Sequence, residues 1–372
     1  MTKKIFIISS ILFLIAGIYL FVQFFLFQEK PIIHENKTKD DLSVLSNKEN
    51  SLDKKIERVI KEEVVTPLMD VSGNKILYFN QGNFLLSNLK GTVKSSIGAY
   101  PFNVLEEIKW SSDNNQAIIK DADKYYIFDI SSLDAKPFKS DADNLIWGSK
   151  KDQVIYKFYD SNSQKRSLNI ADSSGASWEE ITEIPFRYAE IEVNSKDKKV
   201  ALFSLPKASQ ETQLFIVDLL KKEKREIEKK YKGADYRWSP NGEKLLFSYT
   251  KDSGKTSLAI LNINDESVSE LNFPGLVDKC VWLSDSIGIY CANLTYSDTE
   301  VVLPDDWESG KISSSDTFWK IDTVKGEQKR ILELNEINEN VDATSLFMDK
   351  DEKILFFVDK KTNNLFRIKL EN

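Results

Sequence analysis

The sequence predicts an all-β fold, a seven-bladed β-propeller of four-stranded blades, preceded by one N-terminal transmembrane helix. Three observations lead to this prediction. A long apolar run without any charged residue stands near the N-terminus. After residue 54, short strand-like runs alternate with Gly, Asn, Asp and Ser up to the end of the chain. Within them, one hairpin pattern recurs at intervals typical of propeller blades.

The first predicted element is a membrane-spanning helix at Ile5–Phe27. It contains no charged side chain and a single amide, Gln23, and at 1.5 Å per residue the segment measures about 34 Å, enough to cross a hydrocarbon core of about 30 Å. No small-residue cleavage site follows, so the segment is expected to stay attached as a signal anchor. Lys3 and Lys4 precede it, and the positive-inside rule therefore places residues 1–4 in the cytoplasm. The remainder of the chain is expected on the extracytoplasmic side of the cell membrane.

Residues 28–53 are expected to form a flexible tether. They are polar and charged and hold few aromatic side chains, so they cannot bury enough apolar surface to offset the entropy lost on ordering. His34, the one histidine of the chain, lies in this segment. It is interpreted as a solvated linker residue.

The repeats begin after the tether. The clearest unit, Tyr236–Thr250, reads as a strand, a turn at Ser239-Pro240-Asn241-Gly242 and a second strand, because Pro fixes φ while Asn and Gly tolerate left-handed conformations. Six other segments align on it. The aligned anchor residues are Met69, Trp110, Trp147, Val193, Trp238, Trp282 and Phe347. Intervals of about 40 to 45 residues match four-stranded blades, which predicts a propeller over residues 54–372.

The WSPNGEKLLF segment at Trp238–Phe247 resembles the repeat of TolB-type, WD-repeat-like β-propellers, which consists of an apolar anchor, Ser-Pro-Asp-Gly, Lys and an apolar strand. The other six copies lack the Pro and most lack the Gly. The resemblance implies a propeller over residues 54–372 of a membrane-anchored bacterial protein. It implies no catalytic residue, because propellers host many functions.

Four of the seven Trp residues occupy the anchor position of a repeat. A row of Trp can stack on sugars, but one Trp per blade at a fixed position favours packing between neighbouring blades. The segment Lys54–Ile60 precedes the first anchor, and the last blade has one strand too few. We therefore expect this segment to pair beside Leu365–Leu370 and to close the ring, which would remove an open strand edge.

The two cysteines, Cys280 and Cys291, flank the sixth hairpin. If the turn is centred on Asp285-Ser286, the two residues face each other on adjacent strands, where a disulfide is geometrically possible. A one-residue bulge would shift the register and leave two free buried cysteines instead.

The interval between the sixth and seventh anchors is longer than the others because of an insertion at about residues 293–315. Long loops in compact domains are often functional, and Asp305, Asp306 and Trp307 are therefore candidates for partner binding. Three interpretations of the loop remain open: it folds over its own blade, it contacts a protein or a glycan, or it binds calcium. The Asp-x-Asp-x-Asp-Gly spacing of calcium loops is missing.

The composition restricts the function. The net charge is −7 and the pI about 5.2, so the basic footprint of nucleic-acid binding is missing. One histidine leaves few options for a metal site or for a Ser-His or Cys-His nucleophile, and no metal, cofactor or catalytic residue is predicted. The sequence favours a non-catalytic, membrane-tethered module that binds an unknown protein or envelope polymer. A propeller glycosidase or lyase with acidic residues at the central mouth is the alternative, and a structural subunit of an envelope assembly is another.

Overall fold

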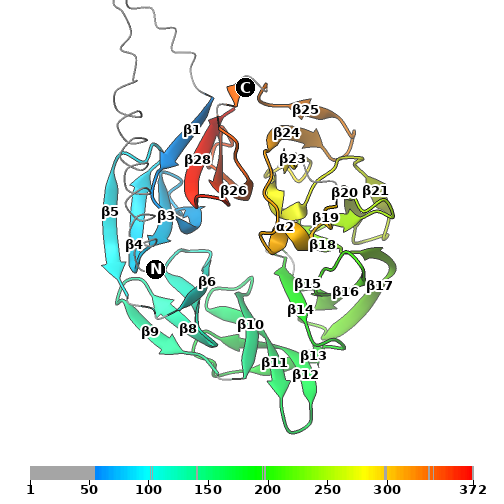
Figure 1. Cartoon of the computed structure of the whole chain (residues 1–372). Coiled ribbons are helices and arrows are strands. Elements are labelled where there is room, and N and C mark those ends of the chain that lie inside the picture. Colours follow the sequence, from blue (N-terminus) through cyan, green and yellow to red (C-terminus); the bar gives the residue numbers. More distant parts are fainter. Residues whose placement is uncertain are drawn as a thin grey trace, which may run out of the picture. The chain divides into compact units, whose positions relative to one another are not determined.

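The computed structural model describes residues 55–372, apart from 101, 103, 140, 195, 197, 297–299, 334, 335, 338, 371 and 372. These residues form seven four-stranded antiparallel sheets. The sheets follow one another around a ring as the blades of a propeller (Figure 1). The predicted membrane helix at Ile5–Phe27, the tether and His34 lie outside the described residues. Within the described part of the chain, no helix is long and apolar enough to cross a membrane.

Each blade places its strands side by side from the centre of the ring outward. The innermost strands are β2 (Val65–Met69), β6 (Leu105–Trp110), β10 (Ala142–Trp147), β14 (Ala189–Val193), β18 (Asp235–Trp238), β22 (Cys280–Trp282) and β26 (Ala343–Met348). The second strands are β3 (Lys75–Asn80), β7 (Gln116–Asp121), β11 (Gln153–Asp160), β15 (Lys199–Ser204), β19 (Lys244–Thr250), β23 (Gly288–Asn293) and β27 (Ile354–Asp359). The third strands are β4 (Asn83–Asn88), β8 (Lys124–Asp129), β12 (Lys165–Asp172), β16 (Glu211–Asp218), β20 (Thr256–Asn262), β24 (Thr317–Asp322) and β28 (Asn364–Lys369). The outermost strands are β5 (Lys94–Ala99), β9 (Asp134–Pro137), β13 (Glu179–Glu183), β17 (Glu223–Lys232), β21 (Val268–Glu270), β25 (Gln328–Arg330) and β1 (Ile56–Ile60). Two short helices, η1 (Val277–Lys279) and α2 (Asp305–Glu308), belong to the sixth blade.

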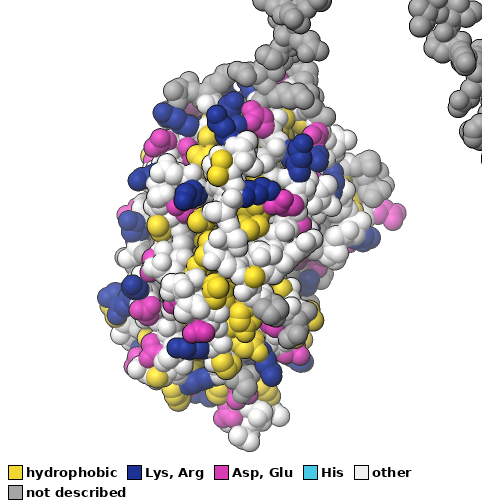
Figure 2. All heavy atoms as spheres, turned by 90° about the vertical axis from the view of Figure 1, so that its left-hand side faces the viewer, with side chains coloured by type: hydrophobic (Ala, Val, Ile, Leu, Met, Phe, Trp, Pro, Cys, Tyr) yellow, Lys and Arg dark blue, Asp and Glu magenta, His cyan; other side chains and the backbone are white. Residues whose placement is uncertain are grey.

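Burial changes from the middle of each blade to its rim. Second and third strands are largely buried, as in β19, where four successive residues from Leu245 to Ser248 are buried, because neighbouring blades cover both of their faces. The outermost strand β17 is charged and largely exposed. Figure 2 shows the flank of the propeller, where basic and acidic side chains are interspersed with a band of hydrophobic ones.

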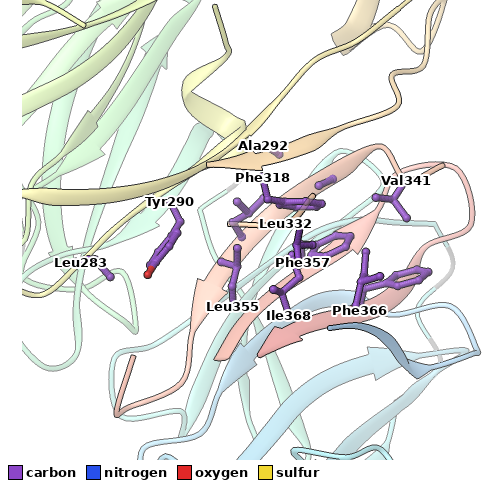
Figure 3. Packing of buried hydrophobic residues seen from close by; sticks show 13 residues of the cluster. Leu283, Tyr290, Ala292, Phe318, Leu332, Val341, Leu355, Phe357, Phe366 and Ile368 are labelled. Atoms are coloured by element: carbon purple, nitrogen blue, oxygen red, sulfur yellow. The ribbon is translucent and has the colours of Figure 1, made fainter. Parts of the chain in front are cut away.

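The hydrophobic core consists of clusters between adjacent blades. Between the sixth and seventh blades, the rings of Phe318, Phe357 and Phe366 pack in sequence (Figure 3). The ring centroids of Phe318 and Phe357 are 4.9 Å apart, and those of Phe357 and Phe366 are 5.4 Å apart. Burying one such side chain stabilises the fold by about 1.5–3 kcal/mol. The stability of each blade therefore depends on its contact with the adjacent blade.

Anchor tryptophans also connect the blades by hydrogen bonds. The indole N–H of Trp110 donates to the carbonyl oxygen of Thr66 at 2.8 Å. Trp147 donates to Lys109 at 2.8 Å, and Trp238 donates to Glu192 at 3.0 Å. Every acceptor lies on the innermost strand of the preceding blade. The prediction that these Trp residues pack between blades is confirmed.

The ring closes through the N-terminal strand. β1 pairs antiparallel with β28, with Ile56 opposite Ile368 and Arg58 opposite Phe366. Ile60 at the end of β1 is 1% exposed. The predicted closure of the last blade by the segment before the first anchor is confirmed.

The turn of the most complete repeat requires its glycine. Gly242 has φ +76°, and a Cβ at this position would lie 2.2 Å from the side-chain nitrogen of Asn194. That nitrogen donates to the carbonyl oxygen of Gly242 at 2.9 Å. The turn thus fixes the fifth blade against the fourth, and only a residue without Cβ fits there.

Candidate functional site

A pocket of about 440 Å³ lies at the centre of the propeller. Its walls are the innermost strands β6, β10, β14 and β18 of four successive blades, and η1 and α2 of the sixth blade complete it. In Figure 1, α2 faces the middle of the ring next to β18. The inserted segment therefore forms part of the pocket wall.

Eight of the ten strand residues in the wall occupy the same two positions of a repeat, three residues and one residue before the anchor, and Ile191 and Phe203 are the other two. Residues two apart on a strand share a face, and in these strands that face is directed to the channel. The pairs are Glu107 and Lys109, Asn144 and Ile146, Glu190 and Glu192, and Asp235 and Arg237. In the sixth blade, the residue three before the anchor is Lys279.

The pocket is predominantly acidic. It contains two cationic side chains, and both have carboxylate partners: Lys109 Nζ lies 2.9 Å from Glu107 Oε1, and a terminal nitrogen of Arg237 lies 2.9 Å from Asp278 Oδ1. The pocket also contains six carboxyl groups, namely those of Glu107, Glu190, Glu192, Asp235, Asp278 and Glu308. The pocket therefore has a surplus of negative charge that attracts cations.

Burial and neighbouring charges raise the pKa of several carboxyl groups in the pocket. Burial raises the pKa of Glu192 to about 7, helped by the charge of Asp278 and opposed by that of Arg237. Burial and the charge of Asp278 also raise the pKa of Asp235 well above its ordinary value. Burial raises the pKa of Glu190 and of Glu308 in the same direction. Although 34% of the Glu192 side chain is exposed, its exposed surface faces the channel and not bulk solvent.

The predicted cysteine pair lies on the two inner strands of the sixth blade, β22 and β23. Cys280 on β22 is opposite Cys291 on β23, so the even-length turn assumed for this hairpin is the one observed. A disulfide joins the two residues, and both are 1% exposed.

The inserted segment holds the predicted partner-binding residues, and the ring of Trp307 is buried. Trp307 is 4% exposed and packs with Leu276, Leu303 and Ile312. Its indole N–H donates to Asp342 Oδ1 at 2.9 Å. The loop folds back over the propeller because this contact satisfies the polar atom of the Trp while its ring is buried.

The two acidic residues beside the Trp have structural partners. Asp305 Oδ2 accepts from the backbone N–H of Ala208 at 2.8 Å, and Asp305 Oδ1 lies 3.1 Å from Lys207 Nζ. Asp306 Oδ2 accepts from the N–H of Val302 at 2.8 Å. Asp305 therefore links the insertion to the fourth blade, whereas Asp306 stabilises the first turn of α2.

Metal binding finds no support in this geometry. In the part of the chain that the structure describes, no three or more His, Cys, Asp or Glu side chains gather in a way that could hold a metal ion. The pocket carboxylates can instead accept a cationic organic group, and Glu192, whose pKa is near neutrality, can take up or release a proton.

Known proteins resemble this chain at the level of the fold. No family model matches the sequence, and no curated protein matches it. An oligogalacturonate lyase in complex with manganese has a TM-score of 0.60 at 12% identity, over 86% of this chain and 91% of that chain. The β-propeller domain of Cps50 (Swd1) from Myceliophteria thermophila has a TM-score of 0.54 at 10% identity, over 85% and 100%. A putative TolB from Agrobacterium tumefaciens has a TM-score of 0.46 at 10% identity, over 67% and 88%.

The shared feature is the propeller. Seven four-stranded blades and the likeness to the Cps50 (Swd1) domain confirm the WD-repeat-like β-propeller that the hairpin repeats predict. At 10 to 12% identity, such likeness shows the fold alone. The pocket residues were not among the predicted site residues, although their fixed distance from each anchor is a signal that the sequence contains.

Proposed function

We propose that this chain is a non-catalytic binding module, held at the outer face of a cell membrane by Ile5–Phe27, whose central pocket receives a positively charged segment of a partner protein. The observation that carries the proposal is the surplus of carboxylates in a 440 Å³ pocket whose two cations are paired. A Lys or Arg side chain entering this pocket gains charge-assisted hydrogen bonds. The surrounding apolar residues, such as Ile146 and Phe203, suit the aliphatic stem of such a side chain.

A binding titration tests this proposal. The full chain in detergent is titrated with a fluorescent oligolysine peptide and, in parallel, with an oligoglutamate peptide. We expect binding of oligolysine alone, and we expect it to weaken as salt is added. The double variant Glu107→Gln/Asp278→Asn should weaken it by about tenfold or more, because the pocket loses two carboxylates and its two cations lose their partners.

The matched control removes two charges elsewhere. Glu223 and Glu228 are exposed on the outer strand β17, and Glu223→Gln/Glu228→Gln should leave the affinity within about twofold. Equal binding of oligoglutamate, or equal loss in both double variants, would show that the pocket is not the binding site.

A second candidate is a glycosidase or lyase that uses the same pocket. One observation favours it: the pKa of Glu192 is about 7, a value that suits a general acid or base near neutral pH. Oligogalacturonate, the substrate named for one structural neighbour, is a chain of acidic sugars, and the pocket would repel it. The enzyme candidate therefore requires a neutral or cationic sugar chain, and turnover of such a chain that Glu192→Gln abolishes would favour it over the binding module.

A further inference from the structure

Lys279 is a fully buried cation whose nitrogen meets more acceptors than it has hydrogens. Its side chain is 0% exposed. Nζ lies 2.7 Å from Asp316 Oδ2 and 2.7 Å from Asp342 Oδ1. The hydroxyl of Ser314 at 3.1 Å and the carbonyl oxygen of Ala343 at 2.9 Å complete the shell. An ammonium has three hydrogens, so four acceptors compete for them.

The two carboxyl groups around Lys279 have different environments. Asp342 Oδ1 also accepts from Trp307 and from the Ser314 hydroxyl at 2.8 Å, and its Oδ2 accepts from the Ser314 N–H at 3.1 Å. Asp316 Oδ2 accepts from the Ala343 N–H at 2.7 Å. The second oxygen of Asp316 is buried, and among the described residues no donor satisfies it.

These environments separate the acidities of the two groups. Burial acts to raise the pKa of Asp342, but the charge of Lys279 and the hydrogen bonds outweigh it and hold this pKa below its ordinary value. At Asp316, burial prevails over the charge of Lys279 and raises the pKa. Asp342 is thus the carboxylate of the pair, and Asp316 is the one that favours the neutral acid.

We propose that Lys279 and Asp316 condense to an intramolecular isopeptide bond, with Asp342 as the proton acceptor. Asp342 takes a proton from the Lys279 ammonium, and the free amine attacks Cγ of the neutral Asp316 carboxyl. The new Nζ–Cγ bond forms, the Cγ–Oδ1 bond breaks, and that oxygen leaves as water with the hydroxyl proton and the second proton of the amine. One ammonium, one carboxylic acid and one carboxylate become one amide, one water and one carboxylic acid, so atoms and charge balance.

Geometry and burial favour this condensation. Nζ is in hydrogen-bond contact with an oxygen of the carboxyl that it attacks, and fixed contact of this kind replaces a bimolecular encounter. The Trp307 ring covers the group, with its centroid 4.8 Å from Nζ, and the site excludes bulk water that would favour hydrolysis. The product also loses two costs of the ionic form, a buried charge pair and the unsatisfied oxygen of Asp316.

The bond would link the chain just before β22 to the chain just before β24. The Cys280–Cys291 disulfide lies in the same blade, but it does not enclose the inserted segment. The isopeptide bond does enclose it, because the insertion runs from the end of β23 to Asp316. The crosslink would therefore hold α2 in place at the pocket wall even if the blade opens.

Intact mass spectrometry of the full chain tests the proposal. After reduction of the disulfide and unfolding, we expect a mass about 18 Da below that of the sequence, which corresponds to one water lost in the attack of the Lys amine. Proteolysis should yield a branched peptide that joins Lys279 to Asp316. The full sequence mass for the wild-type chain would overturn the proposal, whatever the variants do.

Three variants assign the residues. Lys279→Arg and Asp342→Asn should restore the full mass, because one lacks the nucleophile and the other lacks the base. Lys157→Arg is the matched control: Lys157 is also buried, at 5% exposed, and its carboxylate partner Asp143 is 58% exposed, so the loss of one water should persist. A mass deficit that persists in Lys279→Arg would refute the assigned bond, and one that persists in Asp342→Asn would refute the role of Asp342.

Discussion

Two tryptophans at the same repeat position differ in their hydrogen bonds. Trp238 donates to Glu192 on the preceding blade at 3.0 Å, whereas the buried indole nitrogen of Trp282 has no partner among the described residues. Trp238→Phe should therefore destabilise the protein by about 1–2 kcal/mol more than Trp282→Phe, because only the first change leaves a carbonyl oxygen without its donor. Equilibrium unfolding in denaturant measures both variants, and equal losses would show that the inter-blade hydrogen bond contributes nothing.

Trp307 offers a second test with single side chains. It is 4% exposed, so Trp307→Ala should cost about 3–5 kcal/mol of unfolding free energy, as for other core tryptophans. Trp178 is 55% exposed, and Trp178→Ala is the control, with an expected change within about 0.5 kcal/mol. A Trp307→Ala protein as stable as the wild type would mean that the inserted segment does not pack on the propeller.

The ionisation of Glu192 makes the stability of the protein depend on pH. Its pKa is about 4.5 in an unfolded chain and about 7 in the folded protein. Between these values the folded state keeps a proton that the unfolded state has released, so this residue makes stability fall as pH rises from 4.5 to 7. Glu192→Gln should flatten the pH dependence of the unfolding midpoint over this range, with Glu223→Gln as the control. An unchanged slope in Glu192→Gln would show that Glu192 ionises in the folded protein as it does in the unfolded chain.

The closing strand β1 buries three of its five residues. Ile56, Val59 and Ile60 are all buried, and their burial is worth about 1.5–3 kcal/mol each. A chain that lacks residues 1–60 also lacks β1, whereas a chain that lacks residues 1–53 keeps it. The melting temperature of the shorter chain should therefore be more than about 10 °C below that of the longer one. Calorimetry on the two truncated chains makes the comparison. Equal melting temperatures would mean that the last blade does not need its outer strand.

Elements were predictable where local chemistry decides them. The turn at Gly242 follows from its turn residues. The pairing of Cys280 with Cys291 follows from the symmetry of the hairpin, and the closing strand follows from a last blade that has one strand too few. The inserted segment was not, because its buried Trp307 is surrounded in sequence by acidic residues that usually mark an exposed loop. Their partners, such as the N–H of Ala208 for Asp305, are far away in the chain, and no local pattern indicates them.

At the scale of the whole molecule, the pocket arises from residues of five blades. Four of them contribute the residues three and one before their anchors, and this regularity could have been found in the sequence. Register shifts within the inner strands, between Leu105 and Glu107 in β6 and between Asp143 and Ile146 in β10, obscure it, because a bulge changes which side chains face the channel. The net charge of −7 also gave no indication that carboxylates gather at one site.

The central claim is that the acidic pocket receives a cationic protein segment, and photocrosslinking tests it most directly. Leu205 lines the pocket and is 36% exposed, so a photoreactive amino acid in its place faces the bound segment in membranes of cells that produce the full chain. The same amino acid at the exposed Leu220, which does not line this pocket, is the control. We expect Leu205 alone to capture a defined protein, with the crosslinked peptide rich in Lys and Arg. Capture of an acidic peptide or of a sugar chain at Leu205, or the same products at both positions, would contradict the account.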